Sequence, residues 1–167
     1  IGLSKMIGIK LPENFNSPYK STNIIDFWRR WHITLSSFLK NYLYFPLGGN
    51  RKGFYRKYQN ILIVMILAGL WHGADWTFVL WGAIHGVLLL INHFWQAKKL
   101  FNINKLLSLW LTFFTVVLAW VPFRANSIES TLNIYKGMFG GFGIVLPQHY
   151  QNLFPENLNY ILLDVGV

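Results

Sequence analysis

Three stretches of this chain are apolar enough to lie in a lipid bilayer. The first, ILIVMILAGLW, covers residues 61–71, the second runs from Trp76 to Trp95, and the third from about Leu106 to Phe123. A helix needs about 20 residues to cross a bilayer, so the second and third stretches predict full spans, whereas the first predicts a helix that enters part-way. The pattern therefore indicates an all-α, polytopic integral membrane protein with re-entrant and transmembrane helices.

The chain divides into four parts on this pattern. Residues 1–57 are expected to hold an irregular loop followed by an interfacial or re-entrant helix, and residues 58–95 a helical hairpin. Residues 104–124 are expected to form a transmembrane helix. Residues 125–167 are expected to form a loop, with one amphipathic helix near 130–139 and the start of a further helix at the end.

The helix of the first part is expected from Ile24 to Leu47. Asn23 or Thr22 is placed to cap its start, and Pro46 with the Gly-Gly-Asn turn after it stops the helix. Its apolar positions are interrupted by polar ones: Arg29, Arg30, His32 and Lys40. Such a helix is too polar to face lipid along its length, which favours a helix at the interface or one buried by other protein.

A helix break is expected inside the hairpin. A helix that begins near Tyr58 would carry His72 about 20 Å inward, within a hydrocarbon core about 30 Å thick. Gly73 would then end this helix, and Asp75 would cap the next one. The histidine is therefore expected at a break in the helix and at membrane depth.

The second helix of the hairpin carries a patch of small residues where another helix can approach closely. The patch consists of Gly82, Ala83 and Gly86 around His85. Basic residues lie beyond both ends of the hairpin, within positions 51–57 and 98–105. By the positive-inside rule these ends face the cytoplasm, and the WHGAD turn points toward the other side.

The composition agrees with a membrane protein, because only 13% of residues are charged while 53% are hydrophobic and 18% aromatic. The net charge is +9, and the Lys and Arg residues flank apolar runs, which indicates membrane lipid and not nucleic acid as the partner. The chain has no cysteine, which excludes disulfides and thiolate nucleophiles, and no metal site is predicted. Since it starts at Ile1 and ends on YILLDVGV, we expect an internal piece of a longer protein.

Two histidines carry the candidate chemistry. An ionisable ring inside a bilayer is costly without a partner or a purpose, and a neutral imidazole at His72 can take the proton of an alcohol that attacks an acyl group. His32 can hold the acyl carbonyl or the oxyanion that develops from it. The alternative is that His72 is structural, with its ring bonded to a carbonyl freed by the helix break, and spacing alone supports this reading nearly as well.

The other three histidines are expected to have no catalytic role. His85 lies among small residues and is interpreted as a bridge between two helices. His93 is expected at the membrane surface, and His149 in a loop.

Three charged residues near the candidate histidines have competing interpretations. Asp75 can orient His72, but capping of the following helix is the favoured role. Arg29 and Arg30 are candidates to bind an anionic cofactor such as the phosphates of coenzyme A, with lipid headgroups slightly favoured.

Four segments of the chain resemble the membrane-bound O-acyltransferase family. The two longest are FWRRWHITLSSFLKNYLYFPLGGNRKG and GLWHGADWTFVLWGAIHG, and PENFNSPY and WVPFRA are similar as well. The resemblance covers about residues 1–140. It is greatest to the bacterial branch that contains the alginate O-acetyltransferase membrane subunit, and the teichoic-acid D-alanyl transfer protein is a more distant relative.

The resemblance implies a site, a fold and a reaction. The family's near-invariant histidine falls on His72 and its second active-site position on His32, within a ring of membrane helices around a tunnel. The donor would be acetyl-CoA or another acetyl thioester, with no cofactor held tightly. The branch passes the acetyl group to a periplasmic acetyltransferase, expected to be of the SGNH type, and then to a polysaccharide, which implies a multi-pass protein of the bacterial inner membrane.

The leading expectation is an O-acyltransferase that moves an acetyl group toward hydroxyls of an exported polysaccharide such as alginate. Three alternatives stay open at this point. D-alanyl transfer to teichoic acid would use related motifs. A non-enzymatic transporter would use the intramembrane histidines as a proton relay, and a scaffold would only dock a soluble transferase.

Overall fold

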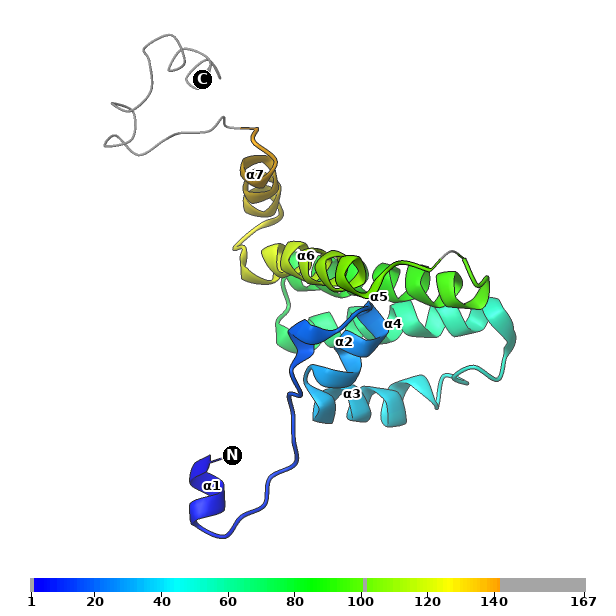
Figure 1. Cartoon of the computed structure of the whole chain (residues 1–167), viewed down its shortest axis with the longest axis vertical. Helices are drawn as coiled ribbons and strands as arrows, with labels where there is room; N and C mark the ends of the chain where they lie inside the picture. The colour runs from blue at the N-terminus through cyan, green and yellow to red at the C-terminus, as the bar shows by residue number, and fades with distance from the viewer. Residues whose placement is uncertain (1, 101, 142–167) are drawn as a thin grey trace.

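Three long helices form the body of the molecule. In this computed structural model, which describes residues 2–100 and 102–141, α4 (Gly53–His72), α5 (Trp76–Ala97) and α6 (Lys105–Arg124) lie side by side with α5 in contact with both others (Figure 1). All regular elements in these ranges are helical. Helices α5 and α6 are long and apolar enough to cross a membrane, in agreement with the two spans that the hydropathy pattern predicts.

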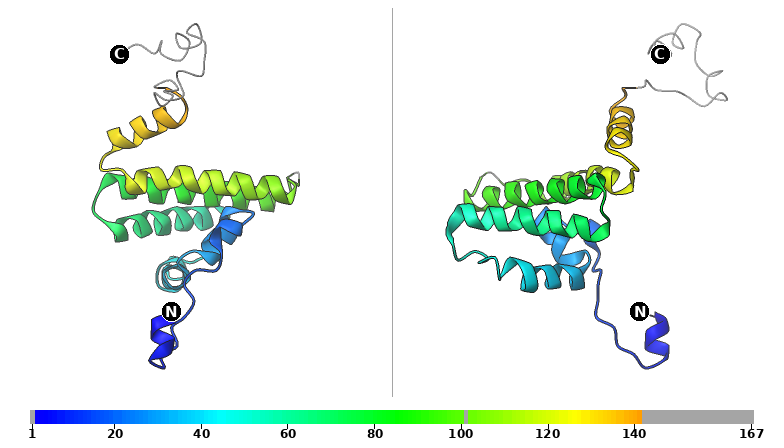
Figure 2. Two further views of the ribbon diagram at one scale, coloured as in Figure 1. Left: turned by 60° about the vertical axis from the view of Figure 1, so that its left-hand side comes forward. Right: turned by 180° about the vertical axis from the view of Figure 1, so that it is seen from behind.

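Shorter elements surround this body. Helices α2 and α3 lie along one side of it, while α1 and α7 project in opposite directions (Figure 2). The short elements are α1 Gly2–Met6, the 3₁₀ turn η1 Pro18–Lys20, α2 Ile24–Arg30, α3 Ile33–Leu39, the π turn η2 Lys40–Tyr44 and α7 Ile128–Met138.

Glycines bring the backbones of α4 and α5 into direct contact. A Cβ atom added at Gly69 would collide with the carbonyl oxygen of Phe78, and one added at Gly82 would collide with the carbonyl oxygen of Met65. The close helix approach predicted at Gly82 and Gly86 is confirmed, and the helix that makes it is α4. Small residues at a helix contact are the usual means by which membrane helices pack.

Helices α2 and α3 pack on different parts of this body. Phe27 of α2 is buried against Val116 of α6 and against α5. Leu39 at the end of α3 is buried with Val64 and Ala68 of α4. The two short helices therefore bury their apolar faces in two separate clusters.

The expectation of one helix over Ile24–Leu47 is wrong, although its start is confirmed, because the Asn23 side chain accepts a hydrogen bond from the Asp26 amide at 2.8 Å. The backbone is extended at Trp31 and enters the left-handed region at His32, with φ 45°. A straight helix has a single apolar face along its length. Such a helix cannot reach both clusters, so the chain turns between α2 and α3.

Helix α4 begins at Gly53, five residues before the expected start near Tyr58. The first turns of α4 carry exposed basic residues such as Arg56. The hydropathy pattern therefore did not predict that the helix includes these turns. The 20 residues of α4 extend about 30 Å at about 1.5 Å per residue. His72 is the last of them and lies at the far end from the basic loop.

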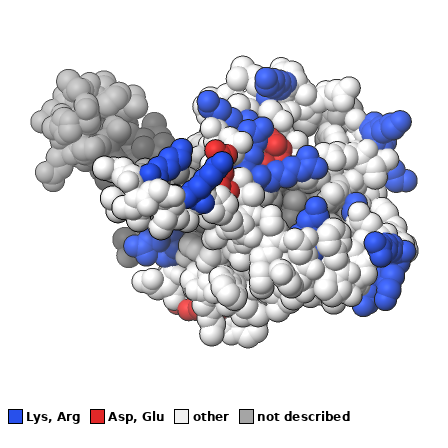
Figure 3. Space-filling view, turned by 90° about the horizontal axis from the view of Figure 1, so that it is seen from below, with Lys and Arg blue, Asp and Glu red and all other residues white. Residues whose placement is uncertain are grey.

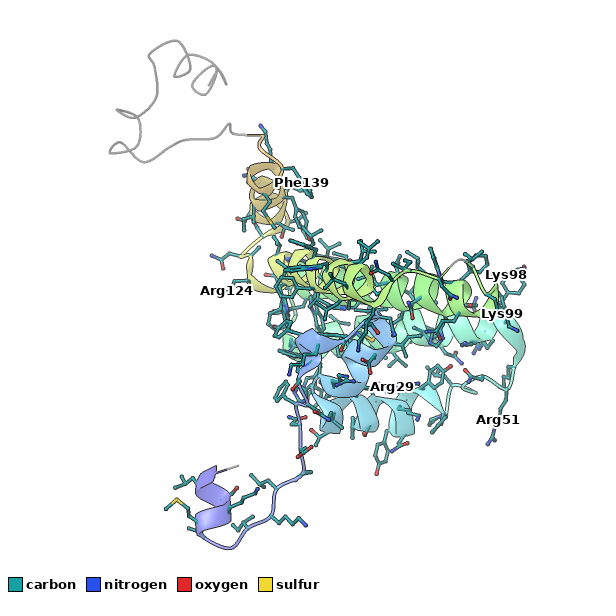
Figure 4. The ribbon with its side chains drawn as sticks, viewed as in Figure 1. Arg29, Arg51, Lys98, Lys99, Arg124 and Phe139 are labelled. Atoms are coloured by element: carbon teal, nitrogen blue, oxygen red, sulfur yellow. The ribbon has the colours of Figure 1, made fainter. Side chains whose placement is uncertain are left out.

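Basic residues mark one end of the three-helix body. Arg51, Lys98 and Lys99 lie at this end, and Arg124 lies at the opposite end (Figure 4). Viewed from below, Lys and Arg side chains far outnumber Asp and Glu on the surface (Figure 3). The α4–α5 hairpin therefore has both its outer ends on one side and its His72 turn on the other.

Enlarging Gly82 is expected to destabilise the α4–α5 pair. The added methyl group would collide with the Met65 carbonyl, and such overpacking costs about 1–3 kcal/mol. Gly82→Ala in the intact protein should therefore lower the melting temperature measured in detergent. Ala97→Leu, at an exposed position of the same helix, is the control and should leave it unchanged. An unaltered melting temperature for Gly82→Ala would contradict the backbone contact.

Candidate active site

His72 lies against a wall of aromatic rings from α5 and α6. Its ring centroid is 5.4 Å from that of Trp81 and 5.0 Å from that of Phe123, and both contacts are edge-on. In the described part of the chain the His72 side chain is otherwise exposed. The imidazole is therefore supported on one side and accessible to a reactant on the other.

The turn after His72 explains why the ring is held there. A Cβ atom at Gly73 would lie 2.5 Å from the ring of Phe78. The backbone can therefore pack against this ring only because residue 73 is glycine. The Asp75 carboxylate accepts a hydrogen bond from the Thr77 amide at 3.2 Å. The predicted capping role of Asp75 is thus confirmed, and α5 starts directly after the break.

His32 forms the corner between α2 and α3. Its φ of 45° lies in the left-handed region, which is costly for a residue with a Cβ atom. Its Nδ1 atom is buried and has no hydrogen-bond partner among the described residues. Backbone strain and an unpaired buried polar atom tend to persist at functional sites, where they serve the mechanism.

Asn14 holds this corner from a distant part of the chain. Its backbone carbonyl accepts a hydrogen bond from the Ile33 amide at 2.9 Å, and its side-chain oxygen accepts from the amide and hydroxyl of Thr34 at 3.1 and 3.0 Å. These bonds satisfy N–H groups that a helix start leaves free. The neighbouring Phe15 ring is 6.0 Å from His32. Sequence reasoning missed Asn14 as a positioning residue, although the PENFNSPY motif contains it.

The structure brings the two predicted histidines into one region. His72 lies edge-on to Trp81, and His32 directly follows Trp31 in the chain. A chain of indole rings joins their surroundings, because Trp81 lies 6.3 Å from Trp120 and Trp120 lies 5.0 Å from Trp31, the residue before His32. The region therefore combines two imidazoles with an apolar lining that supplies few competing hydrogen bonds.

His85 is fully buried and lies beside this aromatic lining. Its ring stacks on Phe27 at 6.3 Å and meets Trp28 and Trp81 edge-on at 5.2 and 4.9 Å. Neither ring nitrogen has a hydrogen-bond partner among the described residues. His85 thus joins α5 to α2 by packing of its ring.

The two candidate arginines have different surroundings. Arg30 donates to the Asp26 carboxylate at 3.0 Å and forms an ion pair within α2. Arg29 is exposed and its charge acts on His93 of α5. Arg29 is therefore better placed than Arg30 to meet an anion.

A pocket of about 410 Å³ lies elsewhere, between the start of α2 and the adjoining ends of α5 and α6. Neither His32 nor His72 lines it. Within residues 2–100 and 102–141, no three His, Asp or Glu side chains come together as a set of metal ligands. His149 lies outside the described residues.

Comparison with known families decides the relationship of this chain. The sequence profile of the membrane-bound O-acyltransferase family matches residues 1–98. The chain belongs to this family. The matched range includes the His32 corner, the His72 turn and the whole of the α4–α5 hairpin.

Several bacterial members of the family are similar over most of this chain. It is 51% identical over 149 residues to the peptidoglycan O-acetyltransferase of Helicobacter pylori, covering 87% of this chain and 28% of that protein. It is 45% identical over 139 residues to the probable alginate O-acetylase AlgI of Pseudomonas aeruginosa, covering 83% and 27%. It is 32% identical over 131 residues to the teichoic acid D-alanyltransferase of Bacillus subtilis, covering 72% and 32%. The chain thus spans less than a third of the length of these relatives.

Replacing His85 by phenylalanine is expected to preserve the fold. A phenyl ring keeps the aromatic packing and removes two buried polar atoms that have no partners among the described residues. His85→Phe in the intact protein should melt at the wild-type temperature or above it, whereas His85→Ala should lose about 3 kcal/mol through the cavity it leaves. Thermal unfolding in detergent measures both. If the phenylalanine variant were as unstable as the alanine variant, the ring nitrogens would have an essential partner.

Proposed function

We propose that this chain supplies the catalytic histidines of a membrane O-acetyltransferase that moves an acetyl group from a thioester donor toward hydroxyls of an exported glycan. The observation that carries the proposal is the chain of indole rings that links the surroundings of His72, at the break after α4, to those of His32, at the strained corner before α3. Membership in an acyltransferase family and acetylase names among the relatives support this chemistry.

His72 acts as the general base in this proposal. Its imidazole takes the proton of the acceptor hydroxyl while the hydroxyl oxygen bonds to the acyl carbon, and it returns that proton to the thiolate that leaves. His32 donates an N–H to the carbonyl oxygen as this oxygen becomes negative. The aromatic lining lowers the local dielectric constant, which strengthens both interactions.

The helices support a multi-pass arrangement in the bacterial inner membrane. Helices α5 and α6 would cross the bilayer, α4 would enter from the end marked by Arg51 and Lys98 (Figure 4), and that end would be cytoplasmic. Helices α2 and α3 would lie at the interface or as a re-entrant pair against α4–α6. We infer that the rest of the polytopic fold encloses the exposed side of His72.

The acceptor is proposed to be a glycan outside the cytoplasm. The relatives named for peptidoglycan and alginate acetylation share 51% and 45% identity with this chain, against 32% for the D-alanyltransferase, so acetyl transfer is favoured over D-alanyl transfer. The donor would be acetyl-CoA or another acetyl thioester, and a periplasmic SGNH-type acetyltransferase would pass the group on to the glycan. No observation favours the transporter or the scaffold.

Removal of the His72 imidazole is expected to abolish transfer. General acid–base catalysis contributes about 10²–10⁴-fold, so His72→Ala in the intact protein should lower glycan acetylation at least about 100-fold. Transfer from radiolabelled acetyl-CoA in proteoliposomes and acetyl content of the glycan in cells measure this. His85→Phe is the matched control and should stay active. Wild-type acetylation by a His72→Ala protein that accumulates normally would refute the catalytic role.

Substitutions at His32 can separate its chemistry from its backbone shape. Glycine and asparagine both tolerate a positive φ, so His32→Gly and His32→Asn should accumulate normally in the membrane. The glycine variant has no donor and should lose about 100-fold in transfer rate, while the asparagine variant keeps an N–H donor and should retain more activity. If His32→Gly transferred acetyl groups at the wild-type rate, His32 would serve only to shape the corner.

A further inference from the structure

Three basic side chains from three helices, Arg29 of α2, Lys57 of α4 and His93 of α5, lie in one neighbourhood. The Nζ atom of Lys57, in the first turns of α4, lies 3.4 Å from Nδ1 of His93 on α5, 36 positions away in the sequence. The charge of Arg29, on α2, acts on the same His93 ring. Tertiary packing has therefore collected these groups, since no local segment contains them.

No carboxylate in the described part of the chain forms an ion pair with Arg29 or Lys57. The acidic side chain nearest in sequence, Asp26, is engaged with Arg30 at 3.0 Å. Lys57 is half-buried, where its positive charge is less well screened than in water. An anion placed among these groups would pair with the positive charges of Lys57 and Arg29.

We propose that Arg29, Lys57 and His93 form a binding site for a phosphate group. Because Lys57 donates to Nδ1 of His93, the other ring nitrogen carries a proton and is itself a donor. Ammonium and imidazole N–H groups from α4 and α5 then lie together, and the α2 guanidinium is near enough for its charge to act on the imidazole. Charge-assisted bonds from such groups to an anion are the strong ones. Arg30 is not part of the site, because Asp26 already neutralises it.

The site is separate from the proposed chemistry. Lys57 precedes His72 by fifteen positions along α4, or about 22 Å at about 1.5 Å per residue. A ligand that serves both places needs a long arm between its phosphate and its acyl group, which is a property of thioester carriers such as coenzyme A. A phospholipid headgroup offers the same phosphate chemistry at the membrane surface. Only the assignment to coenzyme A rests on the proposed function.

Binding to the intact protein in detergent tests the site with two matched pairs of probes. Coenzyme A is compared with pantetheine, which lacks its phosphates, and dioctanoyl phosphatidylglycerol is compared with dioctanoylglycerol. Each is titrated against the wild type, Lys57→Ala and Arg29→Ala. Lys57→Gln keeps a donor toward His93 and guards against loss of the local fold. Arg56→Ala, which removes an exposed charge next to Lys57, is the control.

Loss of Lys57 is expected to weaken binding of one phosphate-bearing probe about tenfold, with its phosphate-free counterpart and the Arg56→Ala protein unaffected. An effect on coenzyme A assigns the site to the acyl donor, and an effect on phosphatidylglycerol assigns it to lipid. Unchanged binding of both phosphate-bearing probes in Lys57→Ala and Lys57→Gln would overturn the proposal. Repeating the titrations with the His72→Ala protein separates the proposed phosphate site from the proposed catalytic role. Phosphate binding should persist in this variant whether or not acetyl transfer is lost.

Discussion

The backbone contact between α4 and α5 determines where both ends of the proposed machinery lie. Glycines such as Gly82 remove the side chains that would otherwise hold the two helices apart. At one end of the hairpin this contact sets His72 against Trp81, and at the other it sets Lys57 against His93. Lipid provides little hydrophobic force to press helices together, so close packing over small residues has to supply the attraction. A wider spacing between α4 and α5 would separate His72 from Trp81 and Lys57 from His93.

The corner at His32 depends on a second set of contacts, which reach it from outside the hairpin. A left-handed backbone at a residue with a Cβ atom persists only when its surroundings enforce it. Asn14 does so through hydrogen bonds to Ile33 and Thr34, and α2 is anchored by burial of Phe27. The strain that places His32 beside the aromatic lining is thus offset by interactions made elsewhere.

The aromatic lining gives the two imidazoles a surrounding of low polarity. Trp28, Trp81 and Trp120 all have buried indole nitrogens with no hydrogen-bond partner among the described residues. Charges interact more strongly in such a medium than in water, so the neighbourhood of His32 and His72 suits a reaction in which a proton moves and an oxyanion forms. Sequence reasoning predicted both histidines as site residues but not this lining, since aromatic residues on three helices give no periodic signal that they will meet.

The sequence by itself determined the features that depend on neighbouring residues. Hydropathy specified the two spans, and local capping chemistry specified the starts of α2 at Asn23 and of α5 at Asp75. Only the tertiary structure decided the break at His32 and the meeting of Lys57 with His93. These features depend on contacts between residues 20 and 36 positions apart in the sequence. Such distant residues meet only when the helices pack. Packing depends on the shapes of the side chains, which the local hydropathy pattern does not encode.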